Sequence, residues 1–416
     1  MEITSPRQEK AVLVGIYREA RGRPLEEESL RELQELTRSA GAEVEATFLQ
    51  ERERMDPAYL VGRGKLEEIL HCVTANQVDL VVFDEDLTPA QLRNLEAALE
   101  TKVIDRSELI LDIFTQRARS REGKLQVELA QLEYLLPRLT GKGLSLSRLG
   151  GGIGTRGPGE TKLEVDRRTI RSRISRIRGD LDKLEARRSL HRQKRRSVPI
   201  PTVGVVGYTN AGKSTLFSCL TRQETFISSK MFATLDPLVR RVELPSGQEI
   251  LLSDTVGFIR KLPHTLVAAF HATLEETLEA DLILHVMDVS HPNHPALREA
   301  VYGVLDEIGL KETPILEVYN KIDLLTRVPV IKNPRDHVFV SARTGEGTEE
   351  LLGRIGSLLN RNYREVRLTI PFDRGDVVSQ LRERARIRCQ EYTENGIHLQ
   401  ASLPLADLGR YQQFVD

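Results

Sequence analysis

The chain has 416 residues, 40% hydrophobic and 29% charged, which is long enough for about three domains with ordinary cores. Its 60 Lys and Arg residues nearly balance 61 Asp and Glu residues, so any affinity for a polyanion must come from where the charges lie. Three widely separated cysteines exclude a disulfide scaffold, and no long uncharged apolar run or apolar leader is present. We therefore expect a cytoplasmic protein without a membrane span.

The first segment, residues 1–105, alternates apolar runs with amphipathic stretches. The runs that predict buried strands are 11–17, 79–83 and 103–105. Residues 25–39 predict one helix, and Thr88 and Pro89 are a typical N-cap and first position of another. This alternation predicts a small parallel α/β subdomain. The glycine-rich stretch 61–65 lacks the spacing of a nucleotide loop, so we interpret it as the turn that starts a helix.

Residues 106–198 carry two apolar stripes at heptad spacing. Leucines form the first stripe, and leucines and isoleucines form the second: 125, 129, 132, 136 and 139, then 163, 170, 174, 177, 181 and 184. They predict an antiparallel helical hairpin with the Gly-rich loop 150–160 near its tip. The second helix, 162–196, has 14 Lys and Arg residues against 5 Asp and Glu residues.

An excess of nine positive charges on one helix favours binding to a phosphate backbone, although a solvated helix face is the alternative interpretation. The candidate RNA-binding residues are Arg156, Arg167, Arg171, Arg178, Arg187 and Arg188.

A second α/β alternation occupies residues 199–362. Its expected strands lie near 202–206, 238–244, 249–253, 281–289, 315–319 and 337–340. This pattern predicts a doubly wound, mostly parallel sheet. Residues 363–416 predict a small α+β domain in which no chemical motif is evident.

Residues 207–214 match the phosphate-binding pattern G-x-x-x-x-G-K-S between an apolar strand and a helix. Backbone amides of such a loop surround phosphates, while Lys213 reaches their oxygens and the Ser214 hydroxyl ligates Mg²⁺. The nucleotide-binding residues expected here are Gly207, Tyr208, Thr209, Asn210, Ala211, Gly212, Lys213, Ser214 and Thr215.

Three shorter motifs follow predicted strands in order. Their residues are Asp254, Thr255, Val256 and Gly257, then Asn320, Lys321, Ile322 and Asp323, then Ser341, Ala342 and Arg343. Asp254 can hold a Mg²⁺-bound water, and the Gly257 amide can contact a terminal phosphate. The Asp323 carboxylate can accept from N1–H and the 2-amino group of guanine, and the backbone of 341–343 can donate to O6. Together with the phosphate loop they predict a P-loop GTPase domain.

At these motifs the sequence resembles the HflX family of ribosome-associated GTPases, which is related to the translation-factor GTPases. The resemblance rests on FATLDP at 232–237, on DTVGFIRKLPH at 254–264 and on GGIGTRGPGE at the hairpin loop. It implies that Thr234 joins Ser214 at Mg²⁺ when GTP is bound. It also implies nucleotide contacts from Phe232, Ala233, Leu235 and Asp236, and a catalytic set of Lys213, Ser214, Thr234, Asp254 and Gly257.

The resemblance further implies a monomeric GTP hydrolase that binds the large (50S) ribosomal subunit and its rRNA. It would split stalled or idle 70S ribosomes under stress, and a fraction of it would lie at the membrane surface. Two alternatives stay open: a GTPase that assists ribosome assembly or RNA modification, and an RNA-binding module in which GTP is only a structural ligand.

Two positions bear on the rate of hydrolysis. Phe258 stands where many GTPases have a water-orienting glutamine, so intrinsic hydrolysis should be slow. Asn210 resembles the asparagine with which some GTPases hold K⁺ against the phosphates. The alternative is that Asn210 only tolerates a tight loop conformation.

Overall fold

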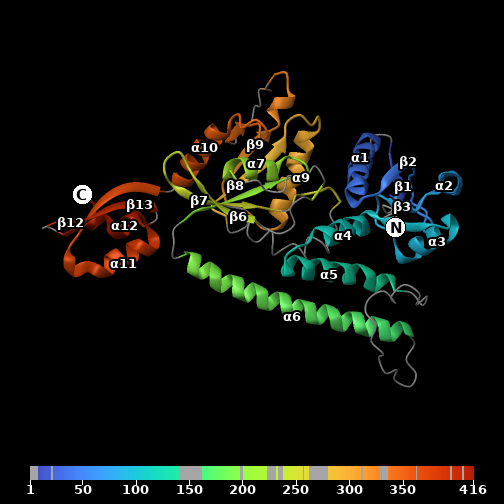
Figure 1. Cartoon of the computed structure of the whole chain (residues 1–416), viewed down its shortest axis with the longest axis horizontal. Coiled ribbons are helices and arrows are strands. Elements are labelled where there is room, and N and C mark those ends of the chain that lie inside the picture. Colours follow the sequence, from blue (N-terminus) through green and yellow to red (C-terminus); the bar gives the residue numbers. More distant parts are fainter. Residues whose placement is uncertain are drawn as a thin grey trace, which may run out of the picture. The chain divides into compact units, whose positions relative to one another are not determined.

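The chain forms two compact units. The first contains residues up to Asp182, together with the short segments around 231–232 and 259–261, and the second contains most of the remainder. Figure 1 presents the computed structural model. It describes residues 8–19, 22–139, 162–196, 200–222, 231–232, 238–255, 257–261, 280–310, 313–327, 329, 336–361, 363–393, 396–404 and 407–416.

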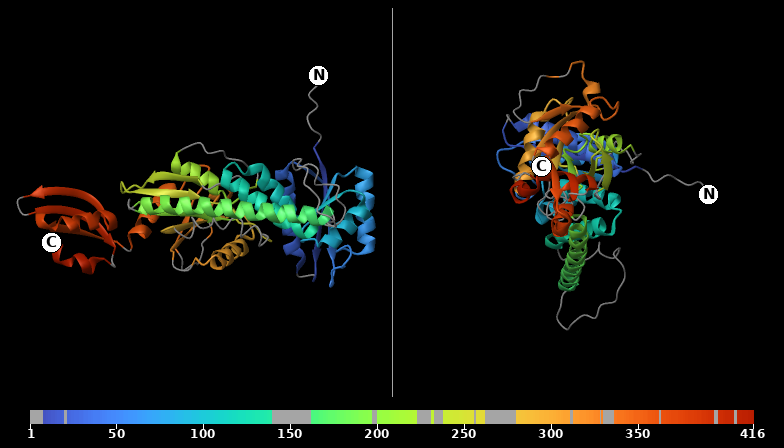
Figure 2. Two further views of the ribbon diagram at one scale, coloured as in Figure 1. Left: turned by 90° about the horizontal axis from the view of Figure 1, so that it is seen from below. Right: turned by 90° about the vertical axis from the view of Figure 1, so that its left-hand side faces the viewer.

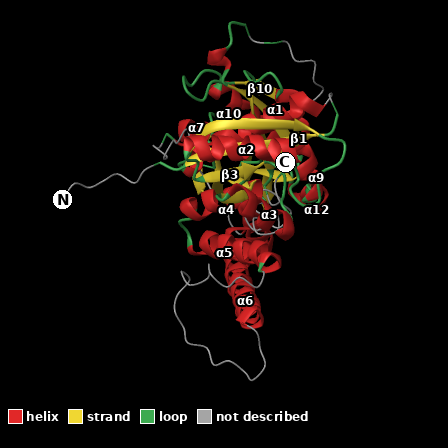
Figure 3. Ribbon diagram, turned by 90° about the vertical axis from the view of Figure 1, so that its right-hand side faces the viewer, coloured by secondary structure: helices red, strands yellow, loops and turns green. Residues whose placement is uncertain are grey.

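The N-terminal sheet is entirely parallel, with the strand order β2-β1-β3-β4, which confirms the predicted α/β subdomain. Its strands are β1 (Lys10–Tyr17), β2 (Glu43–Glu51), β3 (Leu80–Phe83) and β4 (Lys102–Asp105). Its helices are α1 (Arg23–Ala40), α2 (Arg63–Asn76), α3 (Pro89–Leu99) and α4 (Arg106–Arg117). Residues of α2 and α3 share one core with the sheet, and Figure 3 shows both helices near β3. The helices α1 and α4 contact each other.

Local capping in this sheet follows the sequence. The Thr88 hydroxyl accepts from the Gln91 amide, which completes a capping box at the start of α3. The stretch 61–65 leads into α2, which begins at Arg63, as predicted for a helix-start turn. The strand β2 was not predicted, because it lies at the sheet edge and its burial stays partial along its length.

The predicted helical hairpin is formed by α5 (Arg121–Leu135), a 3-10 turn (Leu136–Arg138) and α6 (Lys162–Arg196). Residues from both heptad stripes, including Leu129, Leu132, Ile174 and Ile177, share one apolar cluster, and α5 runs beside α6 in Figure 1. The Arg173 guanidinium also donates to both carboxylate oxygens of Glu128, at 2.7 and 2.8 Å. The loop 150–160, with Arg156, lies outside the described residues.

The second sheet has six strands in the order β10-β9-β8-β5-β7-β6, and only β6 is antiparallel to its neighbour. The strands are β5 (Thr202–Gly207), β6 (Leu238–Glu243), β7 (Glu249–Asp254), β8 (Leu282–Asp288), β9 (Ile315–Asn320) and β10 (His337–Phe339). The described helices are α7 (Lys213–Thr221), α9 (His294–Glu307), α10 (Thr348–Asn360) and a 3-10 turn (Ile322–Leu324). All six strands were predicted. The strand order reverses at β5, so ligands are expected at its carboxyl end.

The C-terminal segment is a three-stranded antiparallel sheet with the order β11-β13-β12. Its elements are β11 (Tyr363–Ile370), α11 (Gly375–Arg384), β12 (Arg386–Thr393), β13 (Gly396–Pro404), α12 (Leu408–Tyr411) and 3-10 turns at Phe372–Arg374 and Gln412–Phe414. Residues of both helices share one core with the sheet, which confirms the predicted α+β fold. Figure 2 shows this segment in red at the C-terminal end of the chain. Among the described helices, none is both long and apolar enough to cross a membrane.

Candidate guanine-nucleotide site

The phosphate loop follows β5, and two of its glycines are required by close backbone approaches. Gly207 has φ 153°, and a Cβ there would lie 2.2 Å from the Val286 carbonyl oxygen. Gly212 has φ 93°, and a Cβ there would lie 2.2 Å from Asn320 Nδ2. These contacts explain the glycine spacing of the motif. The loop leads into the N-terminus of α7, where backbone amides and the helix dipole favour an anion.

Lys213 is buried at the centre of this loop. Its Nζ donates to the carbonyl oxygens of Gly207 at 3.0 Å and Tyr208 at 2.7 Å. Burial lowers the pKa of Lys213 to about 8, although the Asp254 carboxylate opposes this shift. In this structure the ammonium group donates hydrogen bonds to backbone carbonyl oxygens. A bound phosphate would give it a negatively charged partner.

The metal-binding and terminal-phosphate residues converge on the same edge of the sheet. Ser214 Oγ donates to Asp254 Oδ2 at 3.1 Å, so the two oxygens expected near Mg²⁺ are adjacent. Asp254 ends β7 and is 1% exposed. A Cβ on Gly257 would lie 2.8 Å from Lys213 Nζ, so the Gly257 backbone closely borders the phosphate loop. Val256 lies outside the described residues.

Phe258 joins the phosphate loop through its backbone. Its N–H donates to the Gly207 carbonyl at 3.0 Å, and its carbonyl accepts from the Thr209 amide at 2.7 Å. The ring is 4% exposed and packs in a core cluster with Val206 and Ile283. The side chain therefore cannot hold a water by a hydrogen bond, as the sequence predicted.

A pocket of about 680 Å³ lies beside this loop and contains the predicted base-recognition residues Lys321, Asp323, Ala342 and Arg343. Asp323 accepts from the Ser341 hydroxyl at 2.7 Å and forms an ion pair with Arg343 at 2.6 Å. A carboxylate that faces a pocket of this size suits the paired donors of guanine. The structure therefore brings the base and phosphate motifs to adjoining places.

Several residues of the motifs also hold the fold together. Asn320 donates to the Ala211 carbonyl and accepts from the Ala342 amide, both at 2.9 Å, so it ties the phosphate loop to the 341–343 loop. Because the Ala342 amide is engaged in this way, it does not point a free donor at guanine O6 in this structure. Ile322 is buried in a core cluster, and the Thr255 hydroxyl donates to the Val205 carbonyl at 2.6 Å.

The pocket is also lined by residues that the sequence did not identify as candidate nucleotide-binding residues. Ser218, Cys219 and Arg222 line it together with Thr215. These positions are three, four and seven residues after Thr215, which places them on one helical face. Helical periodicity counted from the phosphate motif could therefore have identified them.

The segment expected to contact nucleotide at 232–236 is described only at Phe232. The Phe232 ring packs edge-to-face on Phe114 of α4, with centroids 4.6 Å apart, and it is 4% exposed. The ring is therefore buried in the first unit. A nucleotide contact by this residue stays a prediction. Ala233, Thr234, Leu235 and Asp236 lie outside the described residues.

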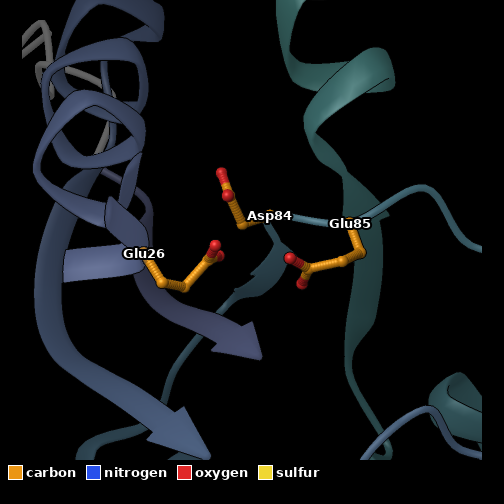
Figure 4. Close-up of side chains that lie close together, drawn as sticks. All are labelled: Glu26, Asp84 and Glu85. Carbon is orange, nitrogen blue, oxygen red and sulfur yellow. The ribbon is translucent and has the colours of Figure 1, made fainter. Parts of the chain in front are cut away.

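Lys261, three residues after Phe258, lies among three carboxylates of the first unit. Its Nζ contacts Asp84, Glu26 at 3.1 Å and Glu85 at 3.0 Å, and Figure 4 shows these carboxyl groups gathered together. Asp84 directly follows β3, at the carboxyl end of the parallel sheet. Neighbouring Arg260 pairs with Glu28 at 3.2 Å. The segment after the D-x-x-G motif is thus held electrostatically against α1 and β3.

The pKa values in this cluster reflect burial and charge. Burial, with the Glu85 and Asp84 charges, raises the pKa of Glu26 to about 8. Burial alone would raise the pKa of Asp84, but Arg106 and Lys261 lower it to about 2. The carboxylates also raise the pKa of Lys261 against the effect of its burial. The cluster therefore keeps Asp84 ionised and Lys261 protonated at neutral pH.

We expect nucleotide affinity to fall as pH rises above about 8. The pKa of Lys213 is about 8 in the free protein, and a bound phosphate must raise it, so binding above that pH takes up a proton. The loss should approach about 10-fold per pH unit, measured by titration calorimetry with GDP between about pH 7 and 9. Lys213→Met should bind weakly without this pH dependence, and an equal dependence in that variant would contradict the assignment.

Comparison with known families agrees with this geometry. Residues 27–115 match a family described as GTP-binding GTPase N-terminal, and residues 117–195 match its Middle Region. Residues 202–321 match a family described as 50S ribosome-binding GTPase.

Individual relatives span the whole chain. GTPase HflX of Caldanaerobacter subterraneus subsp. tengcongensis is 49% identical over 415 residues, covering 100% of this chain and 96% of that protein. GTPase HflX of Escherichia coli K12 is 45% identical over 408 residues, covering 97% and 95%. Among solved structures, a GTP-binding protein from the archaeon Sulfolobus solfataricus in complex with GDP is 24% identical, with a TM-score of 0.46, covering 85% of this chain and 99% of that one. The two HflX relatives show that the chain belongs to the HflX family of GTPases, and its reaction is the hydrolysis of GTP.

Proposed function

We propose that this GTPase binds the large (50S) ribosomal subunit through α6 and separates stalled or idle ribosomes into subunits. The basic surface of α6 carries the proposal. In the described part of this helix, Ile170, Ile174 and Ile177 are buried in a cluster with residues of α5, while Arg171 is exposed. A one-sided basic helix suits an rRNA phosphate backbone. The family description of the GTPase domain supports the same partner.

The candidate RNA-binding arginines differ in their contacts. Arg167 donates to the Leu139 carbonyl at 3.0 Å, and Arg178 pairs with Glu133 at 2.7 Å. These two therefore also stabilise the hairpin, and Arg171 is a cleaner test of RNA binding. The side chains of Arg156, Arg187 and Arg188 lie outside the described residues.

Mg²⁺ is the cofactor that the site fits. The Ser214 hydroxyl and the Asp254 carboxylate are adjacent hard oxygen donors, which suit Mg²⁺ held together with nucleotide phosphates. We assign Ser214 and Thr234 as protein ligands, with Asp254 holding a metal-bound water. When bound, the ion would neutralise charge on the β- and γ-phosphates.

We expect slow hydrolysis by the free protein, acceleration by ribosomes, and faster hydrolysis in K⁺ than in Na⁺. The first expectation follows from the buried Phe258 ring, and the last from Asn210 as a K⁺ ligand. Asn210 has φ 61°, a conformation that asparagine tolerates, so the loop alone also accounts for this residue. Phosphate release in matched KCl and NaCl buffers distinguishes the two, and equal rates would remove the K⁺ assignment.

Ribosome affinity should fall steeply with salt if α6 binds phosphates. Each neutralised phosphate releases counterions, so log K should decline linearly with log salt. Reversing Arg171, Arg187 and Arg188 to Glu should lower both affinity and the salt slope, as measured by sedimentation with 50S subunits. Basal GTPase activity should persist.

Reversal of Arg31, Arg54 and Arg93, which are all exposed in the N-terminal subdomain, provides a control for the change in net charge. Normal binding and an unchanged salt slope in the α6 variant would show that the positive run is only a solvated face.

Sedimentation with 70S ribosomes and separated subunits, in GDP and in a non-hydrolysable GTP analogue, tests the proposal as a whole. Preferential binding to 50S and conversion of 70S into subunits would support it. Binding only to immature particles would favour a role in assembly or RNA modification. RNA binding without multiple-turnover hydrolysis would favour GTP as a structural ligand.

A further inference from the structure

Thr209, the third residue of the phosphate loop, has a buried hydroxyl without a hydrogen-bond partner. Its side chain is 7% exposed, and its Oγ1 finds no donor or acceptor within the described part of the chain. Its backbone amide donates to the Phe258 carbonyl at 2.7 Å, so the side-chain hydroxyl is the group that lacks a hydrogen bond. A buried hydroxyl without a partner costs about 1 to 3 kcal/mol, and most buried polar groups in proteins have a partner.

The surroundings of Thr209 indicate which ligand would satisfy it. A Cβ on Gly257 would lie 3.0 Å from Thr209 Cγ2 and 2.8 Å from Lys213 Nζ, so Thr209 borders the same backbone position as the phosphate-binding ammonium. Gly257 is the residue whose amide is expected at the terminal phosphate. The Thr209 side chain therefore lies where the reacting end of GTP is assigned.

Among the described residues of this region, no glutamine follows the D-x-x-G motif to orient the attacking water. Phe258 occupies the position of the water-orienting glutamine, and its ring is buried in the core beside Val206 and Ile283. A hydroxyl can donate to one oxygen and accept from another, so it can link a phosphate oxygen and a water.

We propose that the Thr209 hydroxyl is a positioning group for hydrolysis, which donates to a γ-phosphate oxygen and accepts from the attacking water. The water oxygen bonds to the γ-phosphorus, and the bond to the β–γ bridging oxygen breaks with its electron pair remaining on GDP. One water proton stays on the released phosphate and the other goes to solvent, so Thr209 is unchanged. This inference rests on the assignment of the phosphate loop as the GTP site.

Single-turnover hydrolysis by the full-length protein tests the role of Thr209. Thr209→Val keeps the shape of the side chain but removes the hydroxyl, and we expect the rate to fall about 10- to 100-fold. GDP affinity should change less than about 3-fold, because the backbone of the loop binds the other phosphates. Thr209→Ser, which restores a hydroxyl, should recover most of the rate.

Binding of GDP with aluminium fluoride provides a readout that a structural role would not change. This complex mimics the γ-phosphoryl group in transfer, so Thr209→Val should weaken its binding while GDP alone binds normally. Thr221→Val is the matched control, because that hydroxyl on α7 donates to the Phe217 carbonyl at 2.8 Å.

Three results would overturn the inference. They are a normal rate in Thr209→Val, a serine variant as slow as the valine variant, and a parallel loss of GDP affinity and rate. If GDP binding were absent even in the unmodified protein, the GTP site assignment itself would be wrong, which is a distinguishable failure.

Discussion

Asp323→Asn should weaken GTP and GDP binding and favour xanthine nucleotides. The carboxylate lies in the base pocket, where it accepts from Ser341. Asparagine presents an amide donor where the carboxylate accepted from guanine N1–H and its 2-amino group. The mismatch should cost about 1 to 3 kcal/mol, or about 5- to 150-fold in affinity. Xanthine has a carbonyl in place of the 2-amino group, so it pairs with the new donor.

Displacement of a fluorescent GDP analogue by GTP and by XTP measures this change in preference. Asp306→Asn, on the exposed surface of α9, is the matched control and should leave both affinities unchanged. If Asp323→Asn retains normal GTP affinity and gains no affinity for XTP, guanine recognition lies elsewhere.

Arg106→Met should destabilise the N-terminal unit by about 3 to 5 kcal/mol in unfolding free energy, because it leaves buried carboxylates without their cation. Arg106 is 1% exposed, and its guanidinium pairs with Asp84 at 2.6 Å and Glu32 at 2.9 Å. Urea unfolding, with hydrogen exchange of the amides in β3 and α4, would localise the loss.

The pH dependence of this loss has a defined sign. The pKa of Asp84 is lowered to about 2 in the folded protein, so its stabilising contribution is present above its usual pKa near 3.8 and disappears as pH falls toward 2. Without Arg106 the pKa of Asp84 rises, and the carboxyl becomes neutral at a higher pH. The difference in stability between Arg106→Met and the unmodified protein should therefore narrow from pH 7 toward pH 4.

Two further variants separate charge pairing from loss of packing. Arg106→Met combined with Asp84→Asn removes both charges and should cost less than the sum of the single changes. Arg23→Met, in the exposed pair with Glu27, should have little effect. An equal loss in Arg23→Met and Arg106→Met would contradict a special role for the buried pair.

Much of the nucleotide site could be predicted from sequence, because its chemistry is encoded in short, contiguous motifs. The phosphate loop needs glycines at 207 and 212, where it closely approaches Val286 and Asn320. The spacing of the motif identifies both positions. Most strands of the second sheet are buried apolar runs, and the hairpin has heptad stripes, so local patterns predicted both. The edge strand β2 escaped prediction because its apolar residues are only partly buried and are interspersed with exposed polar residues, so it has no long apolar run.

Sequence alone thus determined the family, the guanine-nucleotide motifs and the order of the elements, since each depends on residues close together in the chain. Only the tertiary structure placed Lys261 among Glu26, Asp84 and Glu85, which come from distant segments. Only the tertiary structure shows that the Phe232 ring packs on Phe114 and that the Ala342 amide donates to Asn320. It also shows that the buried Thr209 hydroxyl has no hydrogen-bond partner among the described residues. These features depend on long-range packing and on which polar groups find partners, and no local pattern encodes either.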